Sequence, residues 1–294
     1  MPETGRITLG QVFVVIAVVL VLFCIYTMFF SFTCSLPTEL TNRTVCMSNL
    51  KSIGSALTLY KGTNDNKWPW LTDNCTGWQT NPVGLNREVK NDPNTHPEHS
   101  ITALMFLLVR DNQPAKLFVC PSTDDTKDEN TKDPANAKEG EEPKYFWDFS
   151  NSCNVSYSWQ APIKGKDGKY HQGLSDDDND TVVIADKTPR WGPKPWNNTA
   201  WDPALTGSKV EPHMSQNHSG GKAANALSVG INAIKSTRPD IGINNDMIYT
   251  ASGDAAAGSR KATSISIVDH LSTRDTFLIG PVPGPQAGAK TKGE

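Results

Sequence analysis

The sequence predicts an α+β protein, with an N-terminal apolar helix followed by a body in which helices pack on an antiparallel sheet. A long uncharged apolar run opens the chain, and the next segment has apolar residues at helical spacing. The remainder contains short apolar segments separated by turn residues, as in antiparallel sheets. With 22 Gly and 20 Pro, the chain favours a loop-rich body that contains strands over a helical bundle.

Composition limits which classes of protein this chain can belong to. The 294 residues allow one large domain or two small ones. A net charge of −3 gives no electrostatic reason to expect a nucleic-acid partner. Aromatic residues make up 8% of the chain and include eight Trp, so a packed core is expected rather than disorder.

The apolar run Leu9–Phe32 carries no charge. As a helix it is about 36 Å long, which exceeds the roughly 30 Å core of a bilayer. It is longer than the apolar part of a signal peptide, and no small-x-small cleavage pattern follows it closely, so a retained single-span anchor is favoured over a cleaved signal. Arg6 and the α-amino group before the span favour a cytoplasmic N-terminus.

The predicted organisation has four parts. They are an anchor at 1–34, a helical neck at 35–61, an extracytoplasmic α+β body at 62–280 and a disordered, Pro/Gly/Lys-rich tail at 281–294. In the neck, Pro37 is expected to break or kink the helix, with Thr38 or Thr41 capping its restart. Beyond it one apolar stripe is predicted to face the sheet: Cys46, Leu50, Ile53, Leu57 and Tyr60.

The body begins with a short helix, ITALMFLLVR, which Ser100 is expected to cap. A strand is predicted at Lys116–Cys120, and the charged segment 123–144 is predicted to be a mobile surface loop. Further strands are expected at Val155–Gln160, Thr181–Ala185, Ala224–Val229, Met247–Thr250, Ser264–Val268 and Thr276–Ile279.

Four cysteines lie beyond the anchor: Cys46, Cys75, Cys120 and Cys153. In an exported body they predict two disulfides, for which three connectivities exist. Closing the shorter loops favours Cys46–Cys75 with Cys120–Cys153, and independent buried thiols are the alternative. Their spacings match no zinc motif.

Two loops are candidate ligand sites. Asp176, Asp178 and Asp180 concentrate oxygen ligands as a calcium loop does, although the EF-hand Gly and distant Glu are missing and a solvated acidic turn is the alternative. The sequence suggests no cofactor apart from this possible calcium ion. The segment with Trp191, Trp196 and Trp201 presents aromatic faces suited to stacking on sugars, or to pinning the loop on a sheet.

Catalytic motifs are weak. G-x-S-x-G does not occur, and the S-x-x-K of Ser48–Lys51 lies on the neck helix without its partner motifs. Pro97 between His96 and His99 disfavours the helical spacing that a pair of metal ligands needs. We interpret His218, in NHSGG, as the support of a tight Gly-Gly turn rather than as a ligand. The sequence therefore predicts a protein that is not an enzyme.

Several short segments, in this order, resemble landmarks of one family. They are Thr8-Leu9 with Gln11 and VVIA; C-x-x-NLK-x-IG-x-AL-x-x-Y from Cys46 to Tyr60; FVCPS ending at Ser122; ADK at Ala185–Lys187; NHSGG at Asn217–Gly221; and GIN-x-D-x-IYT ending at Thr250. The chain is similar over 8–280 to the bacterial prepilin-like exported proteins of the type IV pilin and type II secretion pseudopilin type. Within them it resembles the large branch with a C-terminal His-x9-Asp-Gly element.

The resemblance implies a pilin fold, in which the N-terminal helix packs on an antiparallel sheet. It implies a structural protein of the bacterial membrane with its body in the periplasm or on the cell surface. Its partners would be like subunits or the pilus and secretion machinery, and some pseudopilins bind calcium.

Three residues near the N-terminus, and one near the C-terminus, depart from that family. The family is cut after a glycine directly before the apolar segment, but here Arg6 follows Gly5. Gln11 stands where the family carries a glutamate that neutralises a neighbouring subunit's N-terminus, and Ser228 stands in place of the Asp of Asp-Gly. These departures speak against processing and polymerisation. The alternative function is an anchored module that binds calcium or glycans.

Overall fold

The structure analysed is a computed structural model of the chain. It describes residues 9–33, 35–71, 77–79, 98–134, 142–160, 162–164, 169–172, 174, 176, 179–187, 204, 206, 210, 214–215, 217–218, 222–242, 248–249 and 278–279. Two compact units are distinguished, Met1–Asn42 and Arg43–Glu294.

The first unit contains the apolar helix α1, Leu9–Thr33. Its stretch Leu9–Thr27 has a mean hydropathy of 2.8 and none of it is buried. Among the described residues it is the one helix long and apolar enough to cross a membrane. By length and composition it qualifies as a single span or as a signal sequence.

Helix α2, Ser35–Thr63, contains Pro37 in its first turn, so the helix does not begin after this proline. The prediction that Pro37 breaks the helix, with Thr38 or Thr41 as cap, is wrong. Pro37 is the third residue of α2, where its missing N–H has no partner within the helix to lose. Proline therefore fits in this first turn.

The predicted stripe on α2 is confirmed. Cys46, Leu50, Ile53 and Leu57 are fully buried, and Tyr60 packs at the edge of the same core. The helix ends in a turn where the Asn66 N–H donates to the Lys61 carbonyl, with Asp65 and Asn66 at φ 53° and 60°. Asp and Asn tolerate this left-handed conformation better than most residues.

Helix α3, Ile101–Arg110, begins as predicted, because the Ser100 hydroxyl accepts a hydrogen bond from the Thr102 N–H. All its residues except Arg110 are buried. The strand expected at Lys116–Cys120 is wrong: Ala115–Phe118 form the 3-10 helix η1 after Pro114. A short apolar run has no periodicity that separates strand from helix, and the Leu117 N–H closes the turn onto the Pro114 carbonyl.

The main sheet has five strands in the order β10-β9-β8-β5-β11, and every pair in it is antiparallel. Its strands are β5 (Tyr157–Gln160), β8 (Val182–Asp186), β9 (Ala224–Ser228), β10 (Ala233–Ser236) and β11 (Leu278–Ile279). Four of them fall within or beside predicted strands, whereas β10 was not predicted. Ile248 and Tyr249, expected in a strand, lie in a turn, and 264–268 lies outside the described residues.

Three small ladders flank this sheet. They are β1 (Gly77–Gln79) with β2 (Glu98–Ser100), β3 (Lys132–Asp133) with β4 (Lys144–Tyr145), and β6 (Ile163–Lys164) with β7 (Tyr170–His171). The second changes the interpretation of 123–144, predicted to be a mobile loop. Its described part contains the β3–β4 pair and a buried Asp128, whose carboxylate accepts the Ser150 N–H at 2.7 Å.

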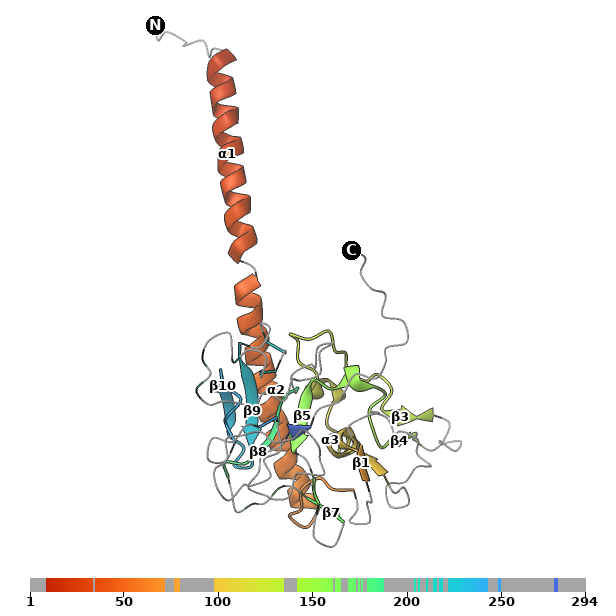
Figure 1. Ribbon diagram of the computed structural model, residues 1–294. Helices are drawn as coiled ribbons and strands as arrows, with labels where there is room; N and C mark the ends of the chain where they lie inside the picture. The colour runs from red at the N-terminus through yellow and green to blue at the C-terminus, as the bar shows by residue number, and fades with distance from the viewer. Residues whose placement is uncertain are drawn as a thin grey trace. The chain divides into compact units, whose positions relative to one another are not determined.

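The largest core cluster lies between helices α2 and α3 and one face of the sheet, and Figure 1 shows α2 passing along strands β9 and β8. The approach is close at Gly54, where an added Cβ would lie 2.7 Å from Cγ2 of Ile231 and 3.3 Å from Leu227. A second cluster, which includes Val182, Ala226 and Tyr249, covers the other side. The predicted α+β class is confirmed.

Candidate functional site

Four buried side chains capable of metal binding meet inside the second unit. Cys46 comes from α2, Cys120 from the segment after η1, Asp186 from the end of β8, and His218 from a turn. Their ligand-type atoms all lie within 4.8 Å of one another, and all four residues have no exposed surface. Cys46 and Cys120 are 74 residues apart in sequence, and Cys120 and His218 are 98 apart. Tertiary folding alone therefore assembles this centre.

Cys46 and Cys120 form a disulfide. The predicted pairing of Cys46 with Cys75 and of Cys120 with Cys153 is wrong, since Cys153 is a free, half-buried thiol. Loop length did not decide the pairing: packing of η1 beside α2 brings the Cα atoms of Cys46 and Cys120 to 5.3 Å, within the range that disulfides use. Cys75 lies outside the described residues.

The His218 ring faces this disulfide. Its Nε2 atom lies 3.6 Å from Cys120 Sγ, 3.4 Å from an Asp186 carboxylate oxygen and 3.1 Å from Asn225 Nδ2. A ring nitrogen offers a single proton or a single lone pair, so it serves one of these neighbours at a time. His218 lies in a turn, but Gly220 and Gly221, whose turn it was predicted to support, lie outside the described residues. Its side chain is fully buried in the core, which was not predicted.

Hydrogen bonds fix the Asp186 carboxylate. One oxygen accepts the Asn225 backbone N–H at 2.6 Å, and the other accepts from Asn217 Nδ2 at 3.4 Å. The Tyr249 hydroxyl donates to the Asp186 carbonyl at 2.9 Å. A fully buried carboxylate is tolerated when donors surround it in this way.

Two tyrosines stay protonated around this centre. Burial, reinforced by the negative charge of Asp186, raises the pKa of both Tyr157 and Tyr249 far above its ordinary range. The Tyr157 hydroxyl donates to Cys46 Sγ at 3.5 Å. At neutral pH it is therefore a fixed donor toward sulfur.

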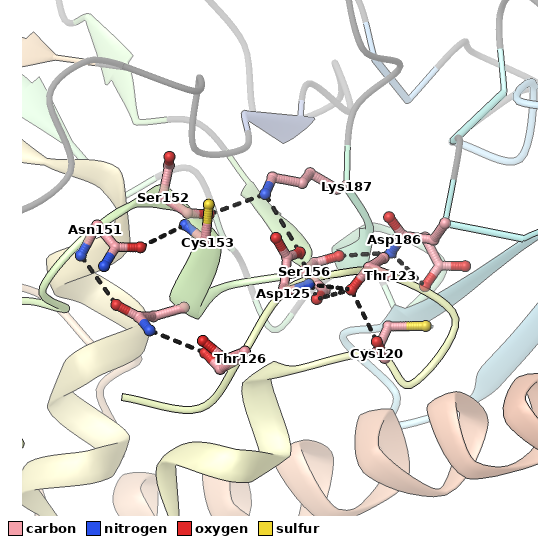
Figure 2. Close-up of polar contacts among 12 residues, drawn as sticks. Cys120, Thr123, Asp125, Thr126, Asn151, Ser152, Cys153, Ser156, Asp186 and Lys187 are labelled. Atoms are coloured by element: carbon pink, nitrogen blue, oxygen red, sulfur yellow. Dashed lines mark hydrogen bonds and ion pairs between the residues drawn. The ribbon is translucent and has the colours of Figure 1, made fainter. Parts of the chain in front are cut away.

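A polar network adjoins the centre (Figure 2). The Ser156 hydroxyl donates to the Asp125 carboxylate at 2.7 Å and lies 3.0 Å from the Thr123 hydroxyl. Lys187 Nζ lies 3.4 Å from Asp125 and donates to the Ser152 carbonyl at 2.9 Å. Although Ser, Lys and Asp occur together in hydrolases, Ser156 is fully buried. We interpret this network as a tie between loops.

The predicted calcium loop is described in part. Asp176 Oδ1 accepts from Lys61 Nζ at 2.5 Å and from Trp68 Nε1 at 3.0 Å, so this oxygen already binds two donors. Asp180 is exposed, and Asp178 lies outside the described residues.

The remaining predicted residues are placed as follows. Gln11 is exposed on α1, whereas Gly5, Arg6 and the three tryptophans 191, 196 and 201 lie outside the described residues. The structure brings none of the described members of these sets to the Cys46–His218 centre.

The sequence did contain a signal for that centre. Each of four landmark segments, C-x-x-NLK, CPS, ADK and NHSGG, holds one residue of a metal-binding type, and these are Cys46, Cys120, Asp186 and His218. Motif spacing misses such a set because each ligand comes from a different element.

Comparison of the chain with protein-family models, with curated proteins and with solved structures gives no match.

Proposed function

We propose that this chain is a membrane-anchored, pilin-like structural protein, with α1 as its retained single span. In this proposal the N-terminus is cytoplasmic, and the body lies in the periplasm or on the cell surface of a bacterium. Like subunits or a pilus- or secretion-type assembly are its partners, and it has no catalytic role.

The observation that carries the proposal is the difference in burial between two consecutive helices. Helix α1 exposes apolar side chains on all sides and carries no charge, which suits lipid. Helix α2 carries a single buried stripe, and its fully buried Leu50, Ile53 and Leu57 hold it against the sheet. A lipid-compatible helix followed by a helix that forms part of the body core is the arrangement expected of a pilin-like subunit.

A calcium-binding module is less well supported. The ion pair of Asp176 with Lys61 engages one of the three proposed carboxylates. A structural role also agrees with the burial of Ser156, the hydroxyl of the network that could have served as a nucleophile.

Native Cys24 tests the assembly part of the proposal. This thiol is free and exposed on α1. If neighbouring subunits pack through α1, a membrane-permeable bismaleimide applied to intact cells will give a covalent dimer. The dimer should disappear in Cys24→Ser, which is otherwise unchanged. Recovery of the chain in the soluble fraction would contradict the anchor, and a membrane-bound chain without dimers would contradict assembly through α1.

Mass spectrometry of the mature N-terminus tests whether the proposed structural protein is processed as a prepilin is. Because Arg6 follows Gly5 and Gln11 replaces the usual glutamate, we expect residues 1–6 to remain on the protein. Removal of this segment would show prepilin-type processing.

A further inference from the structure

We propose that the dithiol form of this chain binds one zinc ion through Cys46, Cys120, Asp186 and His218. This inference does not rest on the anchored structural role. It goes beyond that role because it assigns a cation and its ligands to the buried centre.

The set of donor atoms matches zinc. Two cysteine sulfurs, one imidazole nitrogen and one carboxylate oxygen are the ligand types that Zn²⁺ takes, and four is the number that a closed structural site provides. Calcium and magnesium prefer oxygen ligands throughout, so the two sulfurs select a thiophilic metal. All four residues are fully buried, so they can enclose the ion without water.

The distances between donor atoms agree as well. In a tetrahedron with Zn–S of about 2.3 Å and Zn–N and Zn–O of about 2.0–2.1 Å, sulfur and nitrogen lie about 3.6 Å apart, and nitrogen and oxygen about 3.4 Å. The structure has Cys120 Sγ at 3.6 Å and the Asp186 oxygen at 3.4 Å from His218 Nε2. These two edges of the tetrahedron are already formed.

The edge between the sulfurs forms on reduction. While the S–S bond exists, Cys46 and Cys120 cannot act as two thiolate ligands. An external dithiol breaks this bond by exchange: it gives two electrons and two protons to the cysteines and becomes a disulfide itself. Zinc then replaces the two thiol protons, which go to water, while the Asp186 carboxylate and the neutral His218 ring complete the set.

Groups around the four ligands suit a bound metal. The Tyr157 hydroxyl donates to Cys46 Sγ, and the Asn225 N–H and Asn217 side chain donate to Asp186. Donors of this kind orient metal ligands and offset the negative charge of thiolates and carboxylate. Asn225 Nδ2, 3.1 Å from His218 Nε2, must turn away when the ring nitrogen binds metal.

The consequence is that zinc keeps these elements connected after the disulfide is reduced. Oxidised, the centre joins α2 to the segment after η1; with zinc it also joins β8 and the His218 turn. A chain that has not yet been oxidised would thus hold the same core together.

The test uses the full-length chain in detergent, reduced with a trialkylphosphine. This reductant takes an oxygen atom from water as it becomes a phosphine oxide, and it adds no thiol that competes for metal. The other four cysteines are first changed to serine, so that only the site thiols remain: Cys24, Cys34, Cys75 and Cys153. Co²⁺ serves as the spectroscopic probe, and Zn²⁺ is then added to displace it.

We expect one Co²⁺ per reduced chain, with a thiolate-to-cobalt charge-transfer band and tetrahedral d–d bands that zinc abolishes. The oxidised chain should show neither. His218→Gln and Asp186→Asn should weaken zinc binding by at least about 10–100-fold, the loss known even for groups that only support ligands. The matched control Asp180→Asn, an exposed acid, should leave affinity unchanged.

Three outcomes would overturn the proposal: a reduced chain without the charge-transfer band, clearly substoichiometric binding, or affinity unchanged by both His218→Gln and Asp186→Asn. Should those two variants fail to fold, the reduced chain that keeps His218 and Asp186 still tests the proposal. Zinc must then protect Cys46 and Cys120 from alkylation, as measured by mass spectrometry, and equal alkylation with and without zinc refutes the site.

Discussion

At the scale of single residues, Tyr157 shows how one side chain serves both packing and polar order. Its ring is fully buried in the main core cluster, and its hydroxyl donates to Cys46 Sγ. A tyrosine can take this position because the hydroxyl finds a partner inside the protein. Burial disfavours the ionised hydroxyl, and the negative charge of Asp186 adds to this effect, so the pKa of Tyr157 is raised.

This shift predicts loss of stability at alkaline pH. The pKa of Tyr157 is higher in the folded chain than its ordinary value of about 10, so the unfolded chain loses its proton first as pH rises. The contribution to stability is complete below pH 10 and falls above it, by about 1.4 kcal/mol per pH unit for each such group. Denaturant unfolding of the full chain between about pH 9 and 12 measures this slope.

Tyr157→Phe is the matched variant, because it keeps the ring and removes the titrating hydroxyl. Above pH 10 the free energy of unfolding of this variant should fall less steeply with pH, by about 1.4 kcal/mol per pH unit, because one titrating group is gone. Tyr249 still titrates in the variant, so part of the pH dependence remains. Parallel curves for the two proteins would show that Tyr157 does not contribute.

At the scale of elements, α2 is the helix whose two faces differ most clearly. Leu57 has no exposed surface, whereas Leu59, two residues along, is 63% exposed. Both are leucines in the same helix with similar local propensity, so their substitution separates packing from helix formation.

Leu57→Ala should lower the free energy of unfolding by about 2–5 kcal/mol, because it removes buried apolar surface and leaves a cavity. Leu59→Ala should change it by about 0.5 kcal/mol or less. Chemical denaturation of both variants measures the difference. Equal losses would mean that α2 does not pack on the sheet through this face.

Elements were predictable where local signals agreed. α3 has a capping serine and an apolar run, and β5, β8 and β9 have buried apolar segments between turns. Three errors have different causes: in two the local effect of a proline was misjudged, and in one the strand depends on a distant partner. Pro37 is tolerated because of its place in the first turn of α2, η1 replaces a strand because Pro114 starts a tight turn, and the half-exposed β10 depends on its pairing with β9.

At the scale of the whole molecule, the chain divides into two compact units at residue 42/43. The first contains α1, which is exposed, and the second contains all the buried core described above. Stability of the body and the proposed attachment to a membrane therefore depend on different residues. A substitution in α1 should affect membrane attachment and leave the stability of the body unchanged.

Val18→Lys with Leu22→Lys places two charges in the middle of α1. Each lysine costs about 2.5–3.5 kcal/mol at the centre of a membrane helix, so the chain should move from the membrane to the soluble fraction. The melting temperature of the body should stay the same. The control, Val18→Leu with Leu22→Val, should remain in the membrane. Continued membrane attachment of the lysine variant would contradict the role of α1 as the anchor.

The sequence by itself determined the features that depend on neighbours along the chain. These are the apolar helix α1, the buried stripe of α2, the cap of α3 and the short segments between turn residues that form most strands of the main sheet. Each is set by side-chain spacing within a few residues, which is present before the chain folds.

Only the tertiary structure decided which distant residues meet. The partner of Cys46, the inward direction of the His218 ring and the convergence of both on Asp186 depend on how α2, β8 and two turns pack together. Loop length could not choose the disulfide, and motif spacing could not find four ligands from four elements. Packing of the core fixed their positions, because a close-packed interior leaves each side chain few places to lie.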